Sequence, residues 1–180
     1  SDESLKGDTF GGITIAAVKA DGKLRKKLEE LGVADSKKLS DKEVQRLAEE
    51  IKRHFPCEVI SLLPEEYNSY NGVNVILNKY HKKLADNLQG GTHVVDEYPG
   101  CTVGDIQETK AESKYLEVAA ASILARSAAL SQLHFLSTQA GFELPKGSTH
   151  VKEALERMKH EKKDFSKFVK LHFKNVVEFL

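Results

Sequence analysis

The feature of this sequence that most constrains its fold is a segment from Tyr115 to Ala129 dominated by Ala, Leu, Ile and Val. These residues predict a helix that lacks a continuous polar face, so the helix has to be buried on most of its sides. The same pattern can continue to Gln139, just before Gly141. A helix of this kind needs further layers of secondary structure around it, and the rest of the chain must supply them.

Strand-like and helix-like segments alternate through the remaining sequence. Strands are predicted at residues 9–19, 57–63, 92–98 and 105–109, and helices at 23–31, 40–55, 64–88, 151–158 and the first half of 165–180. Ser40 and Glu43 have the spacing of a capping box. Residues 33–39 and 145–147 are predicted loops. The mixed order is typical of a layered α/β domain, and since no linker or repeat interrupts it, residues 1–180 are expected to form a single domain.

Composition excludes several classes of protein. The 180 residues carry 27 Lys+Arg and 27 Asp+Glu, which excludes a strongly basic protein that binds any polyanion. No apolar run approaches the roughly 18 residues of a membrane span, and the acidic start does not resemble a signal peptide. Cys57 and Cys101 are too few for a disulfide framework. We therefore expect a monomer with free thiols, located in the cytoplasm.

Four acidic residues stand out because of where they occur. Asp2 and Glu3 form an adjacent pair, Asp96 ends an apolar predicted strand, and Glu112 lies at the entry to the alanine-rich helix. Any one of them could equally be a solvated surface charge. Carboxylates brought together stay ionised only around a cation, and hard oxygen ligands select Mg²⁺ or Mn²⁺. Two such ions about 4 Å apart could activate water and stabilise the leaving oxygen of a phosphodiester.

Several short segments carry a resemblance to a known family. In order they are Ser1-Asp2-Glu3 with Lys6-Gly7-Asp8, Asp35-Ser36-Lys37-Lys38-Leu39, Val94-Val95-Asp96, Lys110-Ala111-Glu112-Ser113-Lys114-Tyr115, Ala119 to Arg126, Leu144-Pro145-Lys146-Gly147, and Lys170-Leu171-His172-Phe173-Lys174-Asn175. Together they span nearly the whole chain. On these segments the chain resembles the type 2 ribonuclease H family, and ribonuclease HIII more than ribonuclease HII.

The resemblance implies a ribonuclease H-like fold, with a mixed five-stranded sheet flanked by helices. It also implies hydrolysis of the RNA strand of RNA–DNA hybrids, leaving 3′-hydroxyl and 5′-phosphate ends. Asp2, Glu3, Asp96 and Glu112 then correspond to the acidic quartet that binds two Mg²⁺ or Mn²⁺ ions. Glutamate at the fourth position is similar to ribonuclease HIII. Ser148, where ribonuclease HII has a nearby tyrosine, implies weak activity on a single embedded ribonucleotide.

Substrate contacts are also suggested by the resemblance. Backbone binding needs cations and amide donors near phosphates, and reading of 2′-hydroxyls takes place in the minor groove of the hybrid. The candidates are Lys6, Gly7, Lys37, Lys38, Asn71, Asn74, Ser113, Lys114, Lys146 and Gly147. Each lysine could instead be a solubilising surface charge, and the two asparagines could belong to a turn or helix start.

Some features depart from the family pattern and keep alternatives open. Leu5 stands where the family has a glycine, so its side chain could keep the backbone away from a phosphate. The N-terminal domain of ribonuclease HIII, which resembles the TATA-binding protein, is not expected in this chain. A non-catalytic hybrid-binding module and a ribonuclease HII-like junction nuclease therefore remain alternative functions. His172 is either packed near the site or a general acid or base.

Overall fold

The computed structural model describes the backbone of residues 1–180 and every side chain except those of Asp35 and Ser36. Three strands form an antiparallel sheet in the order β1-β2-β3, with β1 at Asp2–Ser4, β2 at Ile13–Val18 and β3 at Cys57–Leu62. Asp2 pairs with Ala16 in this sheet. A separate parallel pair consists of β4 (Val94–Asp96) and β5 (Ile106–Glu108).

The two sheets meet at a single residue. The amino group of Ser1 donates to the Val94 carbonyl oxygen at 2.8 Å, and the Asp96 amide donates to the Ser1 carbonyl oxygen at 3.2 Å. This is the hydrogen-bond pattern of a parallel pair, with Ser1 opposite Val95. The five strands thus lie in the order β5-β4-β1-β2-β3. The expected α/β arrangement is confirmed, but the continuous sheet is smaller than five strands, because the bonds to β4 come from Ser1, which precedes β1.

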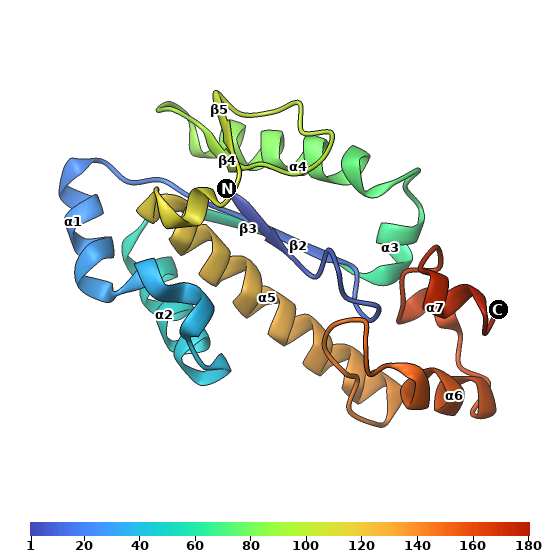
Figure 1. Ribbon diagram of the computed structural model, residues 1–180. Coiled ribbons are helices and arrows are strands. Elements are labelled where there is room, and N and C mark those ends of the chain that lie inside the picture. Colours follow the sequence, from blue (N-terminus) through green and yellow to red (C-terminus); the bar gives the residue numbers. More distant parts are fainter.

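Helices cover both faces of the sheet (Figure 1). The long helix α5 (Leu116–Ala140) crosses one face, where α1 (Gly22–Leu31) and α2 (Asp41–His54) pack beside it. Helix α4 (Val73–Leu88) covers the other face. The shorter elements are α3 (Pro64–Asn68), α6 (Lys152–His160), α7 (Lys174–Val177) and the 3-10 helices η1 (Val33–Lys38), η2 (Ala111–Ser113) and η3 (Phe165–Lys167). No described helix is both long enough and apolar enough to cross a membrane.

The two faces of β2 explain this layering. Ile13, Ile15 and Ala17 pack with α4, whereas Ala16 and Val18 pack with α5, as expected for side chains that alternate along a strand. All of β2 is buried, so it is the central strand of the core. The prediction that the alanine-rich helix is buried is confirmed, and α5 extends to Ala140 before Gly141 ends it with a φ of 83°. The capping box of Ser40 and Glu43 is also present.

The structure differs from the predicted elements in four places. The single helix predicted at residues 64–88 is two helices, α3 and α4, separated by residues 69–72. Residues 2–4 form a strand, because Asp2–Ser4 pairs with β2 despite its polar sequence. Residues 33–38 form a 3-10 helix instead of a loop. The helix predicted from Phe165 is largely absent, because the backbone there bonds to another segment: the Lys170 amide donates to the Thr9 carbonyl, and the Gly11 amide to the Phe168 carbonyl.

Candidate active site

The four predicted acids come from three elements that meet beside the first strand. Asp2 and Glu3 lie in β1, and Asp96 ends β4, which the bond from its amide to Ser1 holds next to β1. The Asp96 carboxylate accepts a hydrogen bond of 2.7 Å from the amide of Ala111, which precedes Glu112 in η2. The fold therefore brings together residues that lie more than one hundred positions apart in the sequence.

The pKa values of these acids show that their charges interact. Burial, and after it the charges of Glu3 and Asp96, together raise the pKa of Asp2 to about 8. Burial also raises the pKa of Asp96; the amide of Ala111 opposes this shift, while Glu112 and Glu3 add to it. Each of these two carboxyl groups is therefore destabilised as an anion by burial and, in addition, by its acidic neighbours.

Two lysines supply positive charge at the edge of the cluster. The Lys37 ammonium forms an ion pair with Oε1 of Glu112, although the Lys37 side chain is 74% exposed and that of Glu112 only 9%. Burial alone would raise the pKa of Glu112, but the hydrogen bond and charge of Lys37 outweigh burial and lower it. On the other side, Lys6 approaches Oε1 of Glu3 at 3.4 Å.

The donor atoms of the cluster fit a divalent cation. Oε2 of Glu112 is buried and has no hydrogen-bond partner among the described side chains, which is costly for a carboxylate oxygen unless a cation or donor meets it. Carboxylate oxygens are the ligands that Mg²⁺ and Mn²⁺ prefer. Among the described side chains, however, no three His, Cys, Asp or Glu residues are already arranged to hold one ion. The carboxylates share one neighbourhood, and ion binding would require them to close further.

The predicted substrate-binding residues separate into two groups. Several adjoin the acids or the loop after β1: Lys6 lies beside Glu3, Lys37 beside Glu112, and Gly7 is in the exposed turn after β1. Lys38 is exposed on η1, and Ser113 and Lys114 flank Glu112, with Ser113 bonded to the Lys110 carbonyl and Lys114 paired with Glu108. Asn71 and Asn74 lie at the start of α4, where Asn74 is next to Gly100, and no described hydrogen bond joins either of them to the four acids.

A second cluster of charges surrounds Lys146 and Gly147. The Gly147 amide donates to the Asp8 carboxylate at 2.7 Å, which joins this loop to the loop after β1. Lys146 and Arg126 both form ion pairs with Asp41 at the start of α2. A small cavity of about 200 Å³ lies among these residues. The cluster places two cations near the loop that follows the acidic pair.

Leu5 has the backbone conformation that the family's glycine would favour. Its φ is 70°, in the left-handed region, and its side chain is buried with Phe10, Ala129 and Leu133. The backbone therefore follows the path open to glycine, and the side chain points into the core instead of towards a substrate. The prediction that the side chain of Leu5 could keep the backbone away from a phosphate is therefore not supported.

His172 packs against aromatic rings. Its ring stacks on Tyr67 at a centroid distance of 5.9 Å and meets Phe173 edge to face at 5.0 Å. No hydrogen bond between His172 and the four acids is among the described contacts. The packing alternative considered for His172 therefore agrees with the structure, and nothing supports its role as a general acid or base.

Three residues at the site were missed in the sequence. His81 bonds to Glu3, Asp8 bonds to Gly147, and the buried Lys170 bonds to the carbonyl of Asp8. Asp8 and Lys170 lie inside the matching segments, so the sequence contained a signal for both. His81 had only a weak signal, since it lies on the apolar face of a predicted helix with Leu77 and Leu84.

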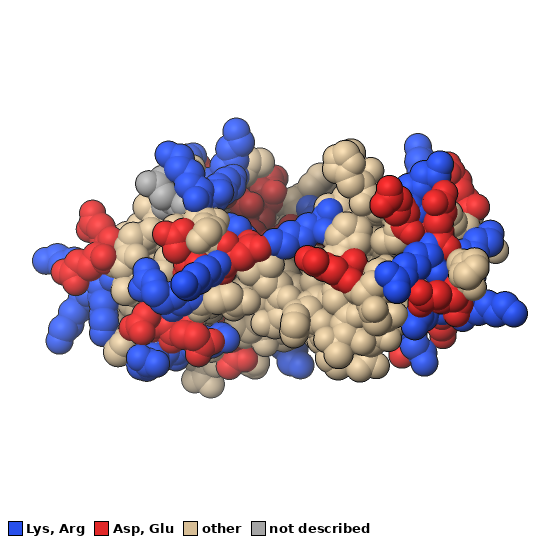
Figure 2. Space-filling view, turned by 90° about the horizontal axis from the view of Figure 1, so that it is seen from below, with Lys and Arg blue, Asp and Glu red and all other residues tan. Residues whose placement is uncertain are grey.

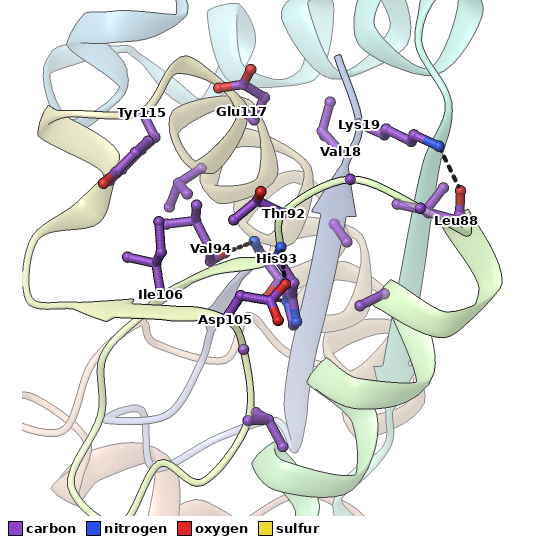
Figure 3. Close-up of a pocket in the computed structure, with 18 of the residues that line it drawn as sticks. Val18, Lys19, Leu88, Thr92, His93, Val94, Asp105, Ile106, Tyr115 and Glu117 are labelled. Atoms are coloured by element: carbon purple, nitrogen blue, oxygen red, sulfur yellow. Dashed lines mark hydrogen bonds between the residues drawn. The ribbon is translucent and has the colours of Figure 1, made fainter. Parts of the chain in front are cut away.

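A large cavity lies beside the acids, but none of the four acids lines it. It has a volume of about 960 Å³ and is lined by segments around Val18, Leu88, His93, Asp105 and Tyr115 (Figure 3). Ser1, which precedes Asp2, and Val94, which lies in β4 with Asp96, are part of its wall. Seen from below, the molecule carries positive and negative side chains at both ends, with mostly other residues between them (Figure 2).

Comparisons with known proteins agree with this fold. The family described as Ribonuclease HII matches residues 1–100 and 100–176. The chain is 32% identical to Ribonuclease HIII of Mycoplasma pneumoniae, over 100% of this chain and 93% of the relative. It is 34% identical to Ribonuclease HIII of Bacillus pumilus, over 97% of this chain and 66% of the relative. It superposes on the crystal structure of Bst-RNase HIII in complex with Mn²⁺ with a TM-score of 0.86 and 30% identity, covering 99% of this chain and 67% of that one.

The fold and these relatives define a metal-dependent endoribonuclease of the ribonuclease H type. The chain belongs to the ribonuclease HII family, and the two relatives from Mycoplasma and Bacillus are ribonucleases HIII. The resemblance inferred from the short segments is therefore confirmed. The chain spans about two thirds of the Bacillus pumilus protein and of the Mn²⁺-bound structure, but nearly all of the Mycoplasma protein.

Proposed function

We propose that this chain hydrolyses the RNA strand of RNA–DNA hybrids with the help of two divalent ions, leaving 3′-hydroxyl and 5′-phosphate ends. The observation that carries the proposal is the shared neighbourhood of Asp2, Glu3, Asp96 and Glu112, in which one buried oxygen of Glu112 lacks a partner among the residues that the structure describes. The names of the relatives and the Mn²⁺ complex of Bst-RNase HIII support it further. Cytoplasmic location and a monomeric state remain predictions.

The four carboxylates would hold the ions, and they differ in their surroundings. Asp2 is 7% exposed, whereas Glu112 is in contact with the exposed side chain of Lys37. Divalent ions in such a site lower the pKa of an attacking water and offset charge on the scissile phosphate and the departing 3′ oxygen. The Ala111 amide fixes one oxygen of Asp96, which limits the rotation of that carboxylate before any ion arrives.

Cations around the carboxylates would bind the substrate backbone. Lys6 and Lys37 each contact an acid of the quartet, so each could turn towards a phosphate once an ion takes over the carboxylate. Lys146 and the loop at Gly147 lie further along the same side, joined to the first loop through Asp8. Contacts with phosphates position a nucleic acid without reading its sequence, which suits an enzyme that acts on hybrids of any sequence.

Replacing Asp96 with Asn tests the proposal. The change keeps the size of the side chain but removes one negative charge from the ion site, so hybrid cleavage in Mg²⁺ or Mn²⁺ should fall by at least about a thousandfold. Asp86→Asn is the matched control, because Asp86 is exposed on α4 and its side chain pairs only with Lys82 among the described contacts. Circular dichroism should be unchanged for both variants. Cleavage by Asp96→Asn at the parental rate would exclude this site.

The choice of substrate separates the remaining alternatives. A duplex with a run of ribonucleotides should be cut efficiently, and one with a single embedded ribonucleotide weakly, because Ser148 stands where ribonuclease HII has a tyrosine nearby. Efficient cutting at the single ribonucleotide would favour the junction nuclease. Binding of a labelled hybrid without any product in either ion would favour a non-catalytic module.

A further inference from the structure

His81 lies completely buried between the candidate metal ligand Glu3 and the first residue of the chain. Its Nε2 is 3.2 Å from Oε2 of Glu3, and its Nδ1 is 2.7 Å from Oγ of Ser1. The same Oγ is 2.7 Å from Nε2 of His93, which lines the large cavity (Figure 3). The ring of Tyr98 packs against His81 at a centroid distance of 5.3 Å. Both ring nitrogens of His81 are thus used, and its position is fixed by contacts on several sides.

When both histidine rings are neutral, one arrangement of protons satisfies the hydrogen bonds that link Glu3, His81, Ser1 and His93. A carboxylate only accepts, so Nε2 of His81 must carry the proton that bonds to Glu3. Nδ1 of a neutral His81 then accepts from the hydroxyl of Ser1, and that hydroxyl in turn accepts from Nε2 of His93. Burial lowers the pKa of both histidines, which agrees with neutral rings. Every donor in this series of hydrogen bonds, from His93 through Ser1 and His81, therefore points towards Glu3.

We infer that His81 is a positioning residue for Glu3: it holds Oε2 so that the carboxylate presents Oε1 to the site where an ion would bind. This inference rests on the proposed function. Oε1 is the oxygen that Lys6 approaches at 3.4 Å, and the Lys6 side chain is 35% exposed and can move away. Oε2, in contrast, is held by a ring with no exposed surface. The two oxygens of Glu3 thus have different partners, one fixed and one replaceable.

A partner of this kind matters for ion affinity. A carboxylate ligand that is free to rotate loses rotational freedom when it binds an ion, whereas a hydrogen-bonded one has already lost it. Loss of such partners typically weakens metal binding about 10- to 100-fold. His81 donates from α4, on the opposite side of the sheet from α5, so the helix and β1 must keep their spacing for the bond to form.

The test compares His81→Leu with His81→Gln by titrating each with Mn²⁺ and measuring free ion by electron paramagnetic resonance. Leucine fills the space but cannot donate, so the Mn²⁺ dissociation constant should rise about 10- to 100-fold. The amide nitrogen of glutamine can take the place of Nε2, so that variant should bind within about threefold of the parent. His134→Leu is the control, because His134 is exposed on α5. Its affinity should be unchanged.

Activity provides a second measurement. If His81 acts through ion binding, the Mn²⁺ concentration for half-maximal hybrid cleavage should rise for His81→Leu, while the rate at saturating Mn²⁺ stays within about threefold of the parent. If His81→Leu does not fold, Ser1→Ala tests the same chain of bonds by removing the donor to Nδ1, and it should also weaken Mn²⁺ binding. Unchanged Mn²⁺ affinity in a folded His81→Leu, or in Ser1→Ala where that variant is needed, overturns the inference. A parent that neither binds Mn²⁺ nor cuts hybrids overturns the proposed function instead.

Discussion

The ammonium group of Lys170 donates a hydrogen bond of 2.6 Å to the main-chain oxygen of Asp8, and the side chain of Lys170 is completely buried. A second bond of 3.0 Å goes to the carbonyl of Gly11. The rings of Tyr67 and Phe173 lie 5.3 and 5.4 Å from the ammonium nitrogen. Lys170 thus joins the C-terminal segment to the loop that follows the acidic pair. Burial lowers its pKa to about 7.

This lowered pKa predicts a pH dependence of stability. An unfolded lysine has a pKa of 10.5, so between about pH 7 and 10.5 the unfolded chain binds more protons at this position than the folded one. The free energy of unfolding should therefore rise with pH in this range, by up to about 1.4 kcal/mol per pH unit from this group. Urea unfolding at pH 7.5, 8.5 and 9.5 measures the slope.

The control is Lys170→Met, which keeps the length of the side chain and removes the titrating group. Other groups, among them Asp2 and Cys57, also titrate near this range, but they contribute equally to both proteins and cancel in the comparison. The slope of the parent should exceed that of the variant. Equal slopes would mean that folding does not lower the pKa of Lys170.

The strained backbone of Leu5 predicts an unusual order of stabilities. With a φ of 70° and a side chain only 5% exposed, Leu5 combines an unfavourable conformation with a favourable burial. Leu5→Ala loses the burial and keeps the strain, which should cost about 2–5 kcal/mol. Leu5→Gly loses the burial but is free to adopt positive φ, so it should be about 1 kcal/mol more stable than Leu5→Ala.

Chemical denaturation of the three proteins checks this order. The parent should be the most stable, the glycine variant intermediate and the alanine variant the least stable. At an ordinary position in a helix or strand the alanine variant would be the more stable of the two. Finding alanine above glycine here would show that residue 5 does not have a left-handed backbone in solution.

Much of the helical framework could be predicted because its signals are local. The apolar composition of α5 required burial whatever surrounded it, and the Ser40–Glu43 pair marks the start of α2 through its own hydrogen bonds. The strand at Asp2–Ser4 could not be found in this way. Its three residues are polar, and they are extended only because β2 pairs with them. The C-terminal segment likewise gives its backbone bonds to residues 9–11, a partner more than 150 positions away.

The candidate site shows the same difference between residues with a local signal and residues whose role depends on distant segments. The acids were predicted from their places at strand ends and helix starts, and through the family resemblance, and the structure brings them together. His81 and Lys170 were missed because their roles depend on what surrounds them. One histidine on an apolar helix face has the same pattern as a packed core residue, and a lysine is expected at the surface unless several carbonyl oxygens enclose it. Such enclosure comes from segments distant in sequence, so no local pattern could reveal it.

Gln132 provides a test of the polar link between α5 and the sheet. Its side chain is buried, accepts from the Gly12 amide at 2.7 Å and donates to Ser61 and to the Leu62 carbonyl at 2.8 and 3.0 Å. Gln132→Leu leaves these buried groups without partners and should lower the free energy of unfolding by about 2–4 kcal/mol. Gln139→Leu, the same change at an exposed position of α5, should alter it by less than about 0.5 kcal/mol. Thermal or urea unfolding distinguishes the two, and similar small effects would contradict the hydrogen bonds described.

The ion pair of Lys37 and Glu112 predicts that replacing Lys37 affects substrate binding and ion binding differently. In Lys37→Met the competitor for Oε1 of Glu112 is gone, so Mn²⁺ affinity should not fall. If Lys37 turns to a phosphate when hybrid binds, the Michaelis constant for hybrid should rise several-fold, and the slope of log affinity against log salt should decrease by about one. Lys159→Met, an exposed lysine on α6 at the far end of the molecule, should change neither (Figure 1). Hybrid affinity and salt dependence equal to those of the parent would assign Lys37 to charge balance at Glu112 alone.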